Sequence, residues 1–124
     1  MRTAYWAVPS MVLAILAAPL SGAHHSAAAM DFANTVEIEG ILKEIQVVNP
    51  HTKLVLEVTD EKGTRDIEFE AHSRNNVYRA GYRDGIIKAG DKITATVAPM
   101  RDGSDGGYVT GFETADGQRV GLAN

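Results

Sequence analysis

Residues 36–47 read Val-Glu-Ile-Glu-Gly-Ile-Leu-Lys-Glu-Ile-Gln-Val, and this stretch decides the fold. Its first apolar side chains fall at alternating positions, as a half-buried strand requires: Val36, Ile38 and Leu42. Ile45 and Val47 continue the alternation in the opposite phase. A phase change inside one strand indicates a bulge, here near Lys43–Glu44, and Gly40 leaves room for close approach of another backbone segment. We therefore predict a long, bent first strand of the kind that a small closed barrel needs.

More segments of period two follow, separated by turn residues. Asn49-Pro50-His51 ends the first strand, because proline cannot donate to a strand ladder. Asp60-Glu61-Lys62-Gly63 is typical of a hairpin turn. The later alternating segments centre on Leu54–Val58, Ile67–Phe69, Ile93–Val97, Tyr108–Thr114 and Val120–Leu122. We expect each of them to be a strand.

Between the third and fourth strands the period becomes helical, with Val77 and Ala80 on one face. The Ser73 hydroxyl is placed to cap this short helix, and Gly85 is placed to end it. The order of three strands, a helix and two strands matches the OB-fold, a partly open five-stranded barrel. A plain meander of five or six strands also fits. We predict a mainly β protein: a small OB-fold-like barrel of five to six strands with one short helix between strands 3 and 4.

The N-terminal segment has the features of an export signal. Arg2 precedes an apolar run from Met11 to Leu20, and small residues at Ser21 and Ala23 suit cleavage after Ala23. The run is shorter than the roughly 20 apolar residues that span a bilayer, and Pro9 and Pro19 bracket it, so we expect cleavage and no stable membrane insertion afterwards. The alternative is a membrane anchor that stays attached. The expected location is the periplasm or the exterior of a bacterial cell. The predicted organisation is a signal peptide over 1–23, an N-terminal arm over 24–34 and one barrel domain over 35–124.

A second cleavage position keeps the mature N-terminus open. Ala27 and Ala29 form another pair of small residues, so cleavage after Ala29 is the alternative. It would remove both His24 and His25, whereas cleavage after Ala23 leaves His24 as the first residue.

Composition narrows the classes of partner. The formal net charge of −4 repels phosphate backbones, so we expect no nucleic acid to bind. The chain has no cysteine, which excludes disulfides and thiolate ligands. A hydrophobic share of 44% fits a globular domain, and an open barrel has edges through which copies can pair into oligomers.

Seven short motifs follow one another along the predicted mature chain. They are His24-His25-Ser26, Asn49-Pro50-His51, Ser73–Asn76, Arg79–Tyr82, Lys88–Asp91, Arg101–Gly103 and Ala115–Gly117. In this order they resemble a bacterial family of small secreted proteins classed as a domain of unknown function. The resemblance implies an OB-like fold and an exported location, and it implies no activity. This chain has Val48 and Tyr82 where such proteins often carry tryptophan, so an aromatic face would be smaller here.

Histidines suggest a metal site. If cleavage leaves His24 first, its α-amine and imidazole can hold Cu(II) together with a second imidazole, because planar nitrogen ligands suit that ion. The candidate further ligands are His25, His51 and His72. The alternative is structural: His24 and His25 form a solvated tail, His51 is a turn residue and His72 supports the start of the helix.

A second candidate site is a ligand or partner face on the barrel. Such a face needs apolar walls and a few polar groups. The candidate residues are Tyr78, Tyr82, Tyr108 and Arg79. The alternative is that the tyrosines pack in the core and rim while the arginine is solvated.

Three functional hypotheses follow, in descending order. The first is an exported, non-catalytic binding module of the OB type, whose small ligand or protein partner is unknown. The second is a copper-handling protein that uses the His24 amine and imidazole. The third is an enzyme built on that copper centre, which ranks last because the sequence has no nucleophile elbow and no phosphate-binding glycine loop.

Overall fold

A computed structural model describes residues 27–121 of the chain. Its strands are β1 (Val36–Gln46), β2 (Thr52–Asp60), β3 (Gly63–Ala71), β4 (Lys92–Pro99), β5 (Gly107–Thr114) and β6 (Arg119–Gly121). A short α-helix, α1 (Arg74–Arg79), lies between β3 and β4, and a 3-10 helix, η1 (Ala27–Ala29), precedes β1. The predicted fold class is confirmed: five strands form a closed barrel, β6 extends it, and α1 has the predicted place in the order.

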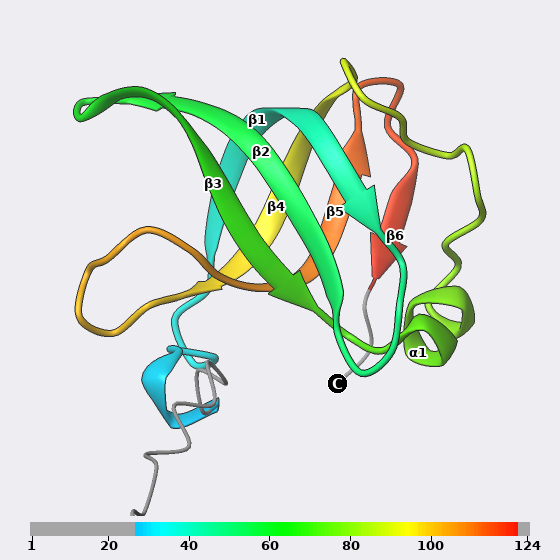
Figure 1. Cartoon of the computed structure of the whole chain (residues 1–124), viewed down its shortest axis with the longest axis horizontal. Helices are drawn as coiled ribbons and strands as arrows, with labels where there is room; N and C mark the ends of the chain where they lie inside the picture. The colour runs from blue at the N-terminus through cyan, green and yellow to red at the C-terminus, as the bar shows by residue number, and fades with distance from the viewer. Residues whose placement is uncertain (1–26, 122–124) are drawn as a thin grey trace, which may run out of the picture.

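The strand pairing excludes the meander. The order in the sheet is β3-β2-β1-β4-β5-β6, so β1 pairs with both β2 and β4. A meander would instead place β3 beside β4. The barrel closes where β3 pairs in parallel with β5, at Glu70 and Tyr108. Figure 1 shows the β2–β3 hairpin extending beyond the barrel at one end and α1 lying beside the other end.

The bend in β1 lies at the predicted position. The register with β2 shifts between Leu42 and Glu44, which leaves Lys43 as the extra residue of a bulge. Residues 36–41 pair with β4 and residues 41–46 pair with β2, so one bent strand serves both halves of the barrel. Burial of the apolar face begins after the first residue of β1, since Val36 is 43% exposed.

Both predicted ends of the helix need correction. Ser73 occupies the N-cap position, but its hydroxyl makes no capping hydrogen bond. The Asn49 side-chain oxygen instead accepts a hydrogen bond from the Arg74 amide at 3.1 Å. The helix ends at Arg79, before the predicted Gly85, because Gly81 adopts φ +105° and the chain then turns Tyr82 into the core.

The main core fills the barrel and reaches α1. Tyr82 is 3% exposed, and Val77 of α1 is buried in the same cluster as the strand residues. Its largest fully buried strand side chains are Leu42, Leu54, Leu56, Phe69, Ile93, Val97, Val109 and Val120. No helix within residues 27–121 is long and apolar enough to cross a membrane.

Gly40 provides a test of the close packing between β1 and β2. A Cβ at this position would lie 2.9 Å from the Glu57 carbonyl oxygen and 3.1 Å from the Leu56 Cβ. We predict that Gly40→Ala lowers the free energy of unfolding by about 1–3 kcal/mol in urea denaturation, because the backbone of β2 must shift. The matched control is Gly121→Ala in β6, where an added Cβ has no neighbour within 4 Å. Equal stability of the two variants would contradict this packing.

Candidate functional site

The seam between β3 and β5 positions the candidate site, and two glycines make it possible. A Cβ on Gly106 would lie 3.2 Å from the Glu68 carbonyl oxygen of β3. A Cβ on Gly107 would lie 2.5 Å from the Ala98 carbonyl oxygen of β4. Only glycine therefore lets the start of β5 fit between β3 and β4. The sequence pattern did not identify these glycines as closure points.

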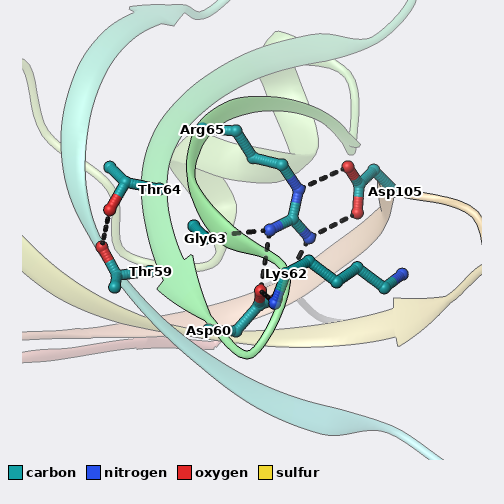
Figure 2. A network of polar contacts seen from close by, with 7 residues as sticks. All are labelled: Thr59, Asp60, Lys62, Gly63, Thr64, Arg65 and Asp105. Carbon is teal, nitrogen blue, oxygen red and sulfur yellow. Dashed lines mark hydrogen bonds and ion pairs between the residues drawn. The ribbon is translucent and has the colours of Figure 1, made fainter.

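Arg65 fastens the loop before β5 to the β2–β3 hairpin (Figure 2). Its guanidinium donates to both Asp105 carboxylate oxygens, at 2.6 and 2.7 Å, and to the Asp60 Oδ1 at 2.8 Å. Hydrogen bonds from Arg65 hold the pKa of Asp60 at about 2 and lower the pKa of Asp105. One cation thus joins two carboxylates that come from opposite sides of the seam.

Five side chains gather at the end of the seam, and we call them the Tyr108 cluster. They are Phe32, His51, Glu70, His72 and Tyr108. The Tyr108 Oη is hydrogen-bonded to the His72 Nδ1 at 2.9 Å. The rings of Phe32, His72 and His51 lie 5.4, 5.1 and 6.3 Å from the Tyr108 ring, measured between centroids. One tyrosine therefore contacts three segments that are distant in sequence.

The polar contacts of the cluster constrain its protonation. The His51 Nδ1 lies 3.3 Å from the Glu70 Oε2. An ionised carboxylate only accepts hydrogen bonds, so this contact places a proton on Nδ1 and leaves Nε2 as the lone-pair nitrogen of neutral His51. Burial, followed by the Glu70 charge, raises the pKa of Tyr108. Its phenol therefore remains protonated at neutral pH.

The N-terminal arm is docked against the same cluster. The Asp31 amide donates to the Pro99 carbonyl at 2.8 Å, and the Arg101 amide donates to the Ala29 carbonyl at 2.9 Å. Met30 and Met100 form an isolated antiparallel bridge beside them. The arm thus continues the sheet locally and carries the Phe32 ring, 41% exposed, onto Tyr108.

The predicted ligand face divides into two parts. Tyr78 and Tyr82 pack edge-to-face at 5.6 Å in and after α1, and Tyr82 belongs to the main core. The Tyr78 hydroxyl donates to Asp84 at 2.5 Å, which raises the pKa of Tyr78. Arg79 is an exposed residue of α1. Tyr108 lies in a different cluster, with His51 and His72. The prediction from sequence placed Tyr108 with Tyr78 and Tyr82 and did not connect it with these histidines.

The four histidines are placed unequally. His51 and His72 both contact Tyr108, whereas His24 and His25 lie outside the described residues. Within residues 27–121, no three His, Asp or Glu side chains are grouped closely enough to hold a metal ion. A metal site at the cluster would therefore need donors from outside that range or of another type.

Sequence reasoning missed Phe32 and Glu70 as members of the cluster. Phe32 lies in an arm without any strand pattern, and Glu70 has the outward position of an ordinary solvated strand residue. No local signal marks them, because their proximity depends on the β3–β5 pairing.

These features define the class of protein as a small OB-type barrel with its candidate site at the β3–β5 seam. The chain belongs to a family of unknown function, DUF6152, whose model matches residues 12–110. The resemblance to a domain of unknown function is thereby confirmed. Comparisons with curated proteins and with solved structures found no match.

The Arg65 network predicts a specific dependence of stability on acid. The pKa of Asp60 is lowered in the folded state, so its contribution is present above about pH 4 and is lost as the pH falls through about 2. We predict that Arg65→Gln flattens the decline in unfolding free energy between pH 4 and pH 2, measured by urea denaturation. The control Arg119→Gln removes an exposed arginine that binds one carboxylate, Glu113. Parallel pH profiles for the wild type and Arg65→Gln would count against the network.

Proposed function

We propose that this protein is an exported, non-catalytic binding module of the OB type that takes a small ligand or protein segment at the Tyr108 cluster. OB barrels bind through the face of strands 2 and 3 and through the loops that follow strands 1 and 4. The cluster draws His51 from the first of these loops, Glu70 from β3, and Tyr108 from the residues just after the second. The proposal rests on this overlap between the Tyr108 cluster and the surface through which OB barrels bind.

The chemistry of the cluster favours a ligand with an apolar or aromatic group and a positive charge. Phe32 offers an exposed ring next to Tyr108. The neighbouring outward positions of β3 carry Asp66, Glu68 and Glu70. Acidic strands disfavour phosphate backbones, in agreement with the expectation that no nucleic acid binds.

Export belongs to the same proposal. The predicted signal peptide over 1–23 precedes the docked arm, and the domain has no cysteine that an oxidising compartment could alter. Cleavage before the arm would leave Phe32 and the barrel intact. The expected location is therefore the periplasm or the cell exterior.

The binding proposal predicts that Phe32→Ala weakens capture of the ligand. The bait is the purified domain, the sample is a cell-envelope extract, and quantitative mass spectrometry compares the species retained. We expect at least one species to be enriched by the wild type and reduced roughly tenfold with Phe32→Ala, since a few central aromatic residues dominate most binding energies.

The matched control is Val36→Ala, because Val36 is exposed to a similar extent, 43%, and lies outside the cluster. It should retain the wild-type profile. Identical profiles for all three proteins, or no enrichment above an unrelated exported bait, would count against the proposal.

Copper binding is the second candidate, and the docked arm is the observation that favours it. The arm holds Phe32 against Tyr108, whose hydroxyl bonds the His72 Nδ1. In the sequence, His24 lies three residues before η1. In this candidate, the His24 amine and imidazole bind Cu(II) with a further imidazole from His72 or His51, and His25 is the other candidate donor. The fixed Nδ1 contacts resemble the outer-shell bonds that orient metal-binding histidines.

The copper candidate predicts a defined N-terminus and a loss on mutation. Mass spectrometry of the exported protein should give His24 as the first residue. Cu(II) titration should then show tight uptake that His24→Ala abolishes, and Tyr108→Phe should weaken it by roughly 10–100-fold through loss of the contact to His72. A mature chain that begins at Met30, or equal weak uptake by the wild type and His24→Ala, would remove this candidate and the enzyme hypothesis that depends on it.

A further inference from the structure

The methionines outside the predicted signal peptide lie together. The chain has four methionines, of which Met1 and Met11 fall within residues 1–23. Met30 and Met100 are far apart in sequence, yet they face each other in an isolated antiparallel bridge. Residues directly opposite in such a pair have Cβ atoms roughly 4.5–5.5 Å apart, with side chains on the same side. Both thioethers are therefore presented to one place.

That place is distinct from the main core. Met30 and Met100 are 3% and 8% exposed, and with Ala98 they form a separate buried cluster on which Tyr108 packs. A hollow of about 140 Å³ adjoins them. Its walls consist of Met30, Glu68, Glu70, Met100, Asp105, Gly106 and Gly107.

The side chains that line this hollow include donor atoms that favour a particular metal ion. Thioether sulfur is a soft ligand and selects Cu(I) over hard divalent ions. The chain has no cysteine, so methionine is its only soft donor. Asp105 is already held by Arg65, and Glu68 is paired with Lys53 at 3.4 Å. The Glu70 Oε2 lies 3.3 Å from the His51 Nδ1, and the Glu70 carboxylate adds negative charge at the wall of the hollow.

We propose that the hollow lined by Met30 and Met100 is a site for Cu(I), bound by the two thioether sulfurs with the Glu70 carboxylate beside them. This site uses neither His24 nor an α-amine as a ligand, so it goes beyond both candidate functions above. A purely structural pair would work equally well as leucines, since Leu and Met exchange with little change in packed volume. That difference makes the proposal testable.

The experiment observes the methionine methyl groups directly. The protein is purified from the envelope of the expressing host, its mass is measured, and its methionines are labelled with ¹³C at the methyl carbon. Ag(I), a redox-inert soft cation, is titrated, and Cu(I) is titrated under reducing conditions. We expect the Met30 and Met100 methyl resonances to shift together and to saturate at one equivalent of metal.

The variant Met30→Leu/Met100→Leu should lose affinity for Ag(I) by on the order of 100-fold while keeping the wild-type circular dichroism spectrum. If the double variant does not fold, each single leucine variant should weaken binding by roughly tenfold, and the methyl shifts of the wild type need no variant. His24→Ala, which removes Cu(II) uptake in the second candidate function, should keep its methyl shifts with Ag(I). Failure of one copper site is thus distinguishable from failure of the other.

Two results would overturn the Cu(I) site. In the first, Ag(I) binds the folded double variant as tightly as the wild type. In the second, saturating Ag(I) leaves both methyl resonances of the wild type unmoved.

Discussion

The parallel contact between β3 and β5 is the constraint on which the structure depends. β1 can pair with β2 and β4 without closing a barrel, and the closure is made at Glu70 and Tyr108. Beside this contact, Gly107 has no room for a side chain against Ala98 of β4, and a Cβ on Gly106 would press on the Glu68 carbonyl of β3. Arg65 of β3 also holds the loop before β5 in place, through charged hydrogen bonds from its guanidinium to Asp105 and Asp60. Backbone fit and side-chain charge thus act at the same seam.

The seam also creates the candidate site. The closing pair, Glu70 and Tyr108, belongs to the Tyr108 cluster, and Tyr108 also packs on the Met30–Met100 pair. The closure of the barrel and the candidate site therefore share residues. Exposed surface ion pairs elsewhere, such as Lys92 with Glu39, hold no comparable position.

Because the family to which the chain belongs has no known function, an activity can be inferred only from the residues of the chain itself. The OB architecture hosts many unrelated functions, so the fold alone does not choose among them. Within one small region, the residues offer two kinds of potential metal donor, imidazole nitrogen and thioether sulfur. His51 and His72 contact the Tyr108 ring, and the buried Met30–Met100 pair packs against Tyr108 as well. Nitrogen and soft sulfur donors serve different ions, which is why the two copper hypotheses are independent.

The sequence by itself determined the strands, the bulge after Leu42 and the place of the helix between β3 and β4, because these follow from side-chain periodicity and turn residues over short distances. It also led to Tyr108, His51 and His72 as separate candidates. Only the tertiary structure decided that these three share a cluster with Phe32 and Glu70, and that Tyr82 is a core residue. It likewise showed that the Asn49 side chain, and not the Ser73 hydroxyl, accepts a hydrogen bond from the first residue of the helix. It also showed that Met30 pairs with Met100. The physical reason is that tertiary contacts, such as the parallel pairing of β3 with β5, join segments that are distant in the sequence, and no local periodicity records which distant segment a strand edge or a side chain will meet.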